Sequence, residues 1–280
     1  MDNKQRKLKI VLEKLYARYN HRHLIKPDPL QFVYKYSSRE DMEVAGFLAA
    51  VLAYGRVRQI EKSLTDLLGR MNGSPYNFIL HFDNKKRKVL KNFKHRFTSG
   101  DDISDLLVLL KKVLNHYSNI EKFFTQGYNK KDKNIVPALS KFCASLLAMN
   151  GTHVTKGLAY LLPCPESGSA CKRLNLFLRW MTRKDNVDTG LWKSVDKAKL
   201  IIPVDVHMGR LCRILELYKQ KTVSLSAAEK ITESFAALEP ADPVKYDFAL
   251  SRIGIVENCT GRRRNECRIC ELSELCEINR

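Results

Sequence analysis

Apolar residues recur every three or four positions along most of the chain, which is the period of a helix with one buried face. Four such stripes are clear, and they comprise Val57, Ile60, Leu64, Leu67, Leu68 and Met71; Ile135, Leu139, Phe142, Leu146 and Leu147; Ala170, Leu174, Phe177, Leu178 and Met181; and Ala227, Ile231, Phe235 and Leu238. No segment alternates apolar and polar residues over a useful strand length. The pattern therefore predicts an all-α protein whose stripes pack into a core.

Capping and turn-forming residues predict where some of these helices begin and end. Ser104 precedes an apolar run through Leu114 and is the expected N-cap of a helix that ends near Ser118. A shorter helix should follow and end near Gly127. Clusters of Gly, Pro, Ser, Asn and charged residues predict loops at 73–75, 98–100, 128–133, 163–169 and 239–243.

The chain of 280 residues is 44% hydrophobic and carries 49 Lys and Arg against 30 Asp and Glu, a net charge of +19. This apolar content excludes an intrinsically disordered chain. No apolar run reaches membrane-spanning length, and the charged N-terminus lacks the apolar core of a signal peptide, so we expect a cytoplasmic location. The positive charge favours nucleic acid as the partner, with an anionic membrane surface or simple solubility as alternatives.

The basic residues are concentrated in two places. From Lys85 to Arg96 the chain has seven basic residues and no acidic one, with Phe93 and Phe97 among them. Such a run is either a solvated helix face or a strip that contacts phosphates. The second cluster is Arg262, Arg263 and Arg264, close to the C-terminus.

Four of the eight cysteines crowd into the C-terminal tail with the spacing C-x7-C-x2-C-x5-C: Cys259, Cys267, Cys270 and Cys276. In a cytosolic chain such crowding favours a metal over disulfides. A zinc site usually pairs two C-x2-C units, and this tail has one, so we expect a [4Fe-4S] cluster, with zinc as the alternative. The cluster would fix the loop that carries the three arginines. The other cysteines, in apolar or helical contexts, are expected to be mostly buried thiols.

Two further segments carry candidate catalytic groups. In the first, an apolar approach from Leu200 and a proline lead to Asp205, which is either a helix N-cap or a catalytic carboxylate. In the second, the turn 165–171 opens a helix at Lys172, and the amides of Gly168 and Ser169 could bind a phosphate. Lys172 is either an ordinary surface lysine or an amine whose pKa is lowered by the helix dipole and by Arg173.

Three of these motifs resemble the helix-hairpin-helix base-excision DNA glycosylases. Pro-Val-Asp-Val-His-Met at 203–208 resembles the catalytic-aspartate segment, most closely that of 8-oxoguanine DNA glycosylases. Gly-Ser-Ala-Cys-Lys at 168–172 resembles the end of the hairpin where lyase-competent members place their lysine. The cysteine tail resembles the iron–sulfur loop of endonuclease III and the adenine glycosylases. Segments 171–181 and 242–250 also resemble a family of bacterial proteins with no assigned function.

The resemblance implies a two-lobed helical fold, with one lobe at 41–208 and the other formed by 1–40 and 209–280. It implies a monomeric DNA glycosylase with lyase activity on a damaged base in double-stranded DNA, such as an oxidised purine. Lys172 and Asp205 would then be catalytic, and Tyr54 or Arg56 would fill the gap left by the flipped base. His207, Gly168, Ser169 and the tail arginines would contact DNA, and Trp192 and Phe248 would line the base pocket. The alternative is a non-catalytic nucleic-acid-binding module that keeps the iron–sulfur tail.

Overall fold

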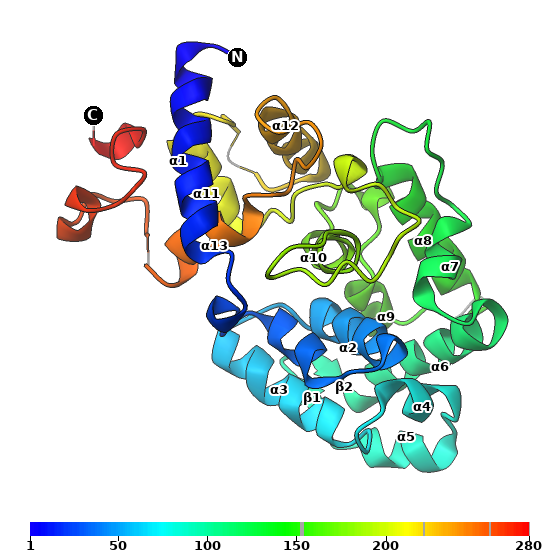
Figure 1. Ribbon diagram of the computed structural model, residues 1–280. Coiled ribbons are helices and arrows are strands. Elements are labelled where there is room, and N and C mark those ends of the chain that lie inside the picture. Colours follow the sequence, from blue (N-terminus) through cyan, green and yellow to red (C-terminus); the bar gives the residue numbers. More distant parts are fainter. Residues whose placement is uncertain (152–153, 221, 258, 280) are drawn as a thin grey trace.

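The computed structural model describes residues 1–151, 154–220, 222–257 and 259–279, and helices are its main elements (Figure 1). The first half of the fold consists of α1 (Asn3–Tyr19), η2 (Pro29–Lys35), α2 (Arg39–Val51), α3 (Val57–Gly69), α4 (Pro75–Leu80), α5 (Asn84–Leu90), α6 (Gly100–Tyr117) and α7 (Ile120–Thr125). The second half consists of α8 (Val136–Ala148), α9 (Lys156–Leu161), α10 (Lys172–Thr182), α11 (Val206–Ile214), α12 (Leu225–Ala236) and α13 (Asp247–Ile255). The prediction of an all-α protein is confirmed.

One short hairpin interrupts this helical pattern. Strands β1 (Lys94–His95) and β2 (Thr98–Ser99) pair antiparallel, with His95 opposite Thr98. Each strand has two residues, which is too short for alternation to be visible in the sequence. The loop expected at 98–100 is therefore wrong, because Thr98 and Ser99 belong to β2 and Gly100 begins α6.

Helix α6 begins earlier than Ser104 because Ser99 is its N-cap. The Ser99 hydroxyl accepts a hydrogen bond from the Asp102 amide, and the Asp102 carboxylate accepts one from the Ser99 amide, which together form a capping box. Ser104 lies within the helix and donates its hydroxyl proton to the Gly100 carbonyl at 2.7 Å. The predicted end is confirmed, since Ser118 is the C-cap.

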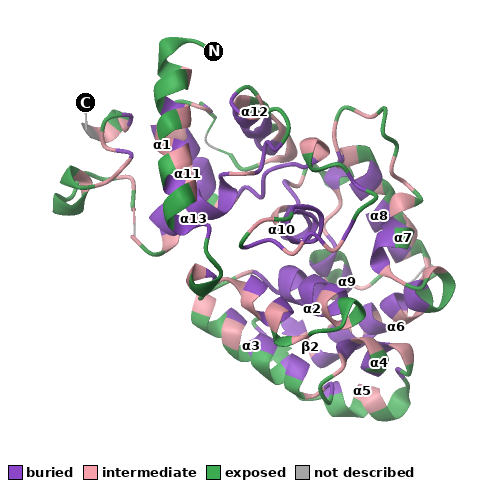
Figure 2. Cartoon of the chain, in the orientation of Figure 1, coloured by how far each residue is buried: buried purple, intermediate pink, exposed green. Residues whose placement is uncertain are grey.

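Helices α2 and α10 pack against each other at the centre of the molecule, and Figure 2 shows both almost wholly buried. All residues of α2 from Glu43 to Val51 are buried, as are all residues of α10 from Arg173 to Thr182. A helix buried on all sides belongs to the core of a protein. The close contact uses Gly46, where an added Cβ would lie 2.9 Å from Met181 Cε.

The two ends of the chain meet at α13, against which α1 and α11 pack (Figure 1). Lys245 Nζ lies 2.7 Å from Glu13 Oε1, and the same carboxylate oxygen accepts the Tyr246 hydroxyl proton at 2.7 Å. The tail beyond α13 runs along the outer side of α1, where Arg18 pairs with Glu271. Within the described ranges, no helix is long and apolar enough to cross a membrane. The expected division into two lobes stays a prediction.

Candidate active site

The structure brings together the two candidate catalytic groups. Lys172 is the first residue of α10 and Asp205 is the N-cap of α11. The Lys172 Nζ lies 3.1 Å from Asp205 Oδ2, and the two side chains are 33% and 27% exposed. The result is an ion pair at the starts of two helices, open enough for a ligand to reach both groups.

Asp205 is held in place from both sides. The preceding residues Ile202 and Val204 are buried, and the Ile202 amide donates to Thr232 Oγ1 at 3.0 Å. On the other side Asp205 Oδ1 accepts the Met208 amide at 2.8 Å. Burial raises the pKa of the Asp205 carboxyl, but the Lys172 charge and the Met208 amide outweigh it, so the pKa lies below its usual value. Asp205 is therefore ionised at neutral pH.

Lys172 is positioned by its two neighbours along the chain. Cys171 adopts the left-handed conformation (φ 45°), and its buried thiol donates to the Pro163 carbonyl at 3.1 Å. Arg173 is also buried and donates to the carbonyls of Val51, at 2.6 Å, and Tyr160. Because these contacts hold the first turn of α10, Lys172 is directed toward Asp205 rather than into solvent.

The ion pair lines a cleft of about 490 Å³. The cleft is bounded by segments distant in sequence, including Pro27–Pro29, Ala53–Val57, Lys172, Arg179, Pro203, Asp205, His207, Asp247 and Arg252. A second cavity of about 850 Å³ shares Tyr54, Gly55, Lys172, Asp205 and His207 with the cleft, and extends along α9 and the turn 163–171. The ion pair thus borders both cavities.

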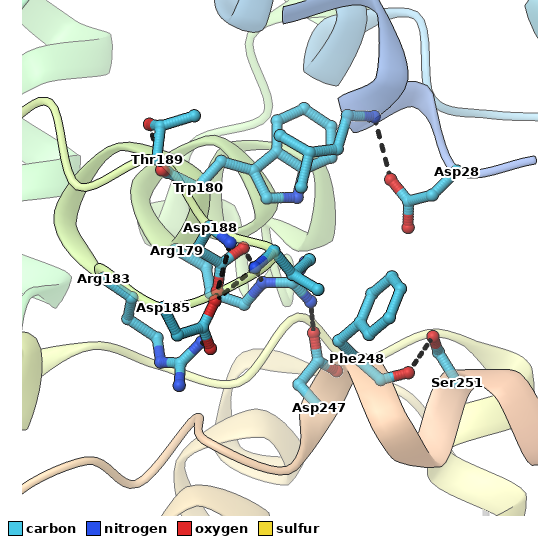
Figure 3. Close-up of polar contacts among 12 residues, drawn as sticks. Asp28, Arg179, Trp180, Arg183, Asp185, Asp188, Thr189, Asp247, Phe248 and Ser251 are labelled. Carbon is cyan, nitrogen blue, oxygen red and sulfur yellow. Dashed lines mark hydrogen bonds and ion pairs between the residues drawn. The ribbon is translucent and has the colours of Figure 1, made fainter. Parts of the chain in front are cut away.

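A buried ionic network adjoins the cleft through Arg179 and Asp247, which line it, and Figure 3 shows the polar contacts of these two residues. Arg179 contacts Asp188 and Asp247, and Arg183 contacts Asp185, Asp188 and Asp242. Burial raises the pKa of Asp247 to about 6, and Asp188 and Asp205 add repulsion, although Arg179 acts in the opposite direction. Asp247 lines the cleft, so a second titratable carboxyl lies in the same site as Asp205.

The sequence-based reasoning missed this network, although the sequence contains a signal for it. Arg179 lies among apolar residues of α10 and Arg183, four residues on, is its C-cap, and Asp185 and Asp188 follow within five residues. Charged residues are rarely buried unless they are paired. The two arginines in and next to this buried helix therefore predict acidic partners in the core.

Four of the eight predicted DNA contacts border one or both of the cavities. Tyr54 and His207 line both, Arg56 lines the cleft, and Ser169 lines the second cavity. Gly168 is exposed close by, with its carbonyl accepting the Leu225 amide at 2.9 Å. Tyr54 is not free to move as a wedge, because its hydroxyl donates to the His95 carbonyl at 3.0 Å and lies 2.6 Å from Thr98 Oγ1.

The two residues expected to form a base pocket do not line the cleft. Trp192 is buried between Phe124 and Phe177, and its indole N–H donates to Glu43 Oε1 at 2.7 Å. Phe248 is buried, and the Arg252 guanidinium lies 4.4 Å from its ring centroid. Both rings therefore fill the core rather than the site.

The tail arginines Arg262, Arg263 and Arg264 are exposed. The four tail cysteines are partly exposed free thiols. Burial raises the pKa of Cys270, and the nearby Cys259 and Cys267 raise it further, so these three thiols interact electrostatically. In the part of the chain that the structure describes, no group of three or more metal-ligating side chains is gathered in binding position. The donor chemistry suits a soft metal centre, whereas the arrangement of the side chains is not that of a closed site.

Residues 28–256 match the family model described as Protein of unknown function (DUF2400). No curated protein and no solved structure matches the chain.

Proposed function

The chain belongs to this family, whose description states no activity, and we propose from the geometry of the site that the protein is a DNA glycosylase with AP-lyase activity. The observation that carries the proposal is the 3.1 Å contact between Lys172 Nζ and Asp205 Oδ2 at the wall of a cleft. An amine and a carboxylate at this distance can exchange a proton and act on the same atom of a substrate.

The proposed reaction begins with rotation of a damaged nucleotide out of the duplex into the cleft. Cleavage of the N-glycosidic bond builds positive charge on the sugar, which the Asp205 carboxylate stabilises. When bound substrate excludes water, Asp205 takes a proton from the Lys172 ammonium. The neutral Lys172 amine then bonds to C1′ as the base leaves with the bonding electrons. The departing base takes the proton from Asp205, which restores the carboxylate that faces the developing positive charge on the sugar.

The lyase step uses the same lysine. Loss of a proton and ring opening give a Schiff base between Nζ and C1′. Removal of a C2′ proton expels the 3′ phosphate and cuts the strand, and water then releases the sugar from Lys172. Double-stranded DNA with a damaged base, with oxidised purines favoured, is the proposed substrate.

We also extend the proposal to the fold and the tail. In the proposed two-lobed helix-hairpin-helix arrangement, Gly168 and Ser169 would lie at the phosphate beside the reacting sugar, with the Ser169 amide as the donor because the Gly168 amide donates to the Pro165 carbonyl at 2.8 Å. Arg56, His207 and the tail arginines would contact neighbouring phosphates. A [4Fe-4S] cluster, or zinc as the alternative, would be held by the four tail cysteines and would hold the arginine loop in shape. No step of the proposed reaction passes through it.

Borohydride trapping tests the proposal, because borohydride reduces a Schiff base to a stable protein–DNA adduct. Duplexes with oxidised purines, oxidised pyrimidines, uracil, alkylated bases or an abasic site are incubated with protein and borohydride. We expect an adduct with at least one duplex, its loss in Lys172→Ala and a decrease of about 100-fold in Asp205→Asn. Lys141→Ala, which removes an exposed lysine on α8, is the matched control and should trap normally.

A non-catalytic nucleic-acid-binding module is the second candidate function. It is favoured by the fact that Asp205 already caps α11 and pairs with Lys172, so both residues have a structural role without any substrate. Absence of both base release and adduct across the whole panel, with DNA binding intact, would replace the enzyme by this module. Base release without an adduct would mean that the protein is a glycosylase without lyase activity, and would contradict only the covalent step on Lys172.

A further inference from the structure

The β1–β2 hairpin is fixed to the edge of the candidate active site. His95 is fully buried, with Nδ1 2.9 Å from Ser63 Oγ and Nε2 3.0 Å from the Tyr54 carbonyl. The Tyr54 hydroxyl in turn donates a hydrogen bond to the His95 carbonyl. These contacts bind the hairpin to α3 and to the loop before it, so the turn residues Arg96 and Phe97 have a defined position.

The turn lies directly beside residues of the cleft. Arg96 has φ 56°, and its side chain crosses Gly55, where an added Cβ would lie 2.8 Å from Arg96 Cδ. Gly55 itself has φ 94° and lines both cavities. A glycine is needed here both for its conformation and for the close approach of Arg96.

Aromatic rings from three distant segments meet at this turn. Phe97 stacks on Tyr54 with ring centroids 5.4 Å apart, and its ring meets that of Tyr160 edge-on at 4.5 Å. The Arg173 guanidinium supports the rings of Tyr54 and Tyr160 at 5.1 and 4.6 Å. Because Arg173 is anchored to backbone carbonyls, the aromatic cluster is rigid.

This cluster is unusually exposed for its composition. Phe97 is 57% exposed and Tyr160 is 39% exposed, although both are large hydrophobic side chains. Exposed cationic side chains occur on the same segments, namely Lys91, Lys94 and Arg96 on and before the hairpin, and Arg56 next to Gly55. Exposed rings together with positive charges on the same segments are suited to a ligand with both a flat π face and phosphates, which is a nucleic-acid strand.

We infer that Phe97, with Tyr160 packed edge-on against it, forms a stacking platform for an unpaired nucleobase of the strand that enters the cleft. The inference rests on the nucleic-acid part of the proposed function and adds a substrate preference to it. Since only a base that has left the helical stack presents a free face to a protein ring, the protein prefers DNA with an unpaired base over fully paired duplex. The cations on these segments hold phosphates next to that base.

Equilibrium binding without any chemistry tests the platform. Fluorescence anisotropy compares a single strand, a duplex with a one-base bulge and a fully paired duplex, at one fixed salt concentration. We expect wild type to favour the bulged duplex, Phe97→Ala to lose about tenfold of that preference, and Phe97→Trp to keep it. Ile10→Ala is the matched control, because Ile10 is also 57% exposed but lies on α1. A 2-aminopurine at the bulge should be quenched by wild type and not by Phe97→Ala.

Three outcomes would overturn the platform: an unchanged preference in Phe97→Ala, an equal loss on all three nucleic acids, or weakened binding of a labelled Glu-Tyr copolymer with nucleic-acid binding intact. The last result would identify a docking site for acidic protein segments. A failed borohydride trap does not affect this readout, so the inference and the proposed reaction fail separately.

Discussion

At the scale of single residues, the most informative contact is the one between Lys172 and Asp205. The sequence was sufficient to predict Asp205 as an N-cap and to select Lys172, because a capping residue and a turn are local features. Their meeting depends on how α10 and α11 pack, which no local pattern encodes. The resemblance supplied that expectation, and the structure brings the two groups into contact.

The charge of Asp205 should make stability depend on pH. Its folded pKa lies below the ordinary 3.8, so its contribution is complete above about pH 4 and is lost as the pH falls through the folded pKa. Asp205→Asn keeps a capping acceptor but removes the charge. We expect urea unfolding to show a loss of up to about 1 kcal/mol at pH 7 that shrinks toward pH 3. Asp101→Asn, at a side chain 78% exposed, is the comparison, and a loss that grows toward pH 3 would contradict the assignment.

At the scale of elements, the sequence predicted the presence of helices well, but not their exact starts or which distant segments pack together. The α6 boundary was missed because Ser99 is followed by Gly100 and two aspartates, which are poor helix formers, whereas Ser104 leads into the apolar run. The signal for Ser99 is its acidic partner three residues on, Asp102. Trp192 was assigned to a pocket through the resemblance, because an aromatic ring can stack on a flipped base. Its true partner is Glu43, a buried carboxylate that also accepts the Ile120 and Glu121 amides at the start of α7.

The cysteine tail is the element whose proposed role is most directly measurable. We expect purified protein to contain about four iron atoms and four acid-labile sulfides per chain, and Cys270→Ser to lose both and to unfold at a lower temperature. Cys212→Ser, which alters a buried thiol of α11, should keep the iron. Stoichiometric zinc without sulfide would replace the cluster by the alternative metal, and a metal-free native protein would contradict both.

At the scale of the whole molecule, the net charge of +19 is distributed unevenly. Some basic residues of the segment 85–96 make contacts within the protein, since Lys86 Nζ donates to the His81 carbonyl and Arg87 pairs with Asp101 and Asp105. The exposed basic residues include Lys91, just before the hairpin, and Lys94, in β1. Composition alone predicted a negatively charged partner. Only the fold shows which basic side chains make contacts within the protein and which are exposed to a ligand.

Salt dependence of DNA binding tests this separation. Each phosphate contact that is lost lowers the slope of log Kobs against log salt by about one, so Lys91→Ala with Lys94→Ala should lower it by about two. The pair Lys14→Ala with Lys141→Ala removes the same charge from exposed positions of α1 and α8. Equal slopes for the two double variants would mean that binding follows net charge and not this surface.

The position of Lys172 and Asp205 on the border of both cavities has a consequence for which molecules can be substrates. A ligand that fills the cleft alone touches the two groups from one side, whereas one that continues into the neighbouring cavity also gains contacts along α9 and the turn 163–171. Contacts remote from the reacting atoms can lower the barrier of the reaction itself. We therefore expect a long, continuous strand to be processed faster than a fragment short enough to fit the cleft alone.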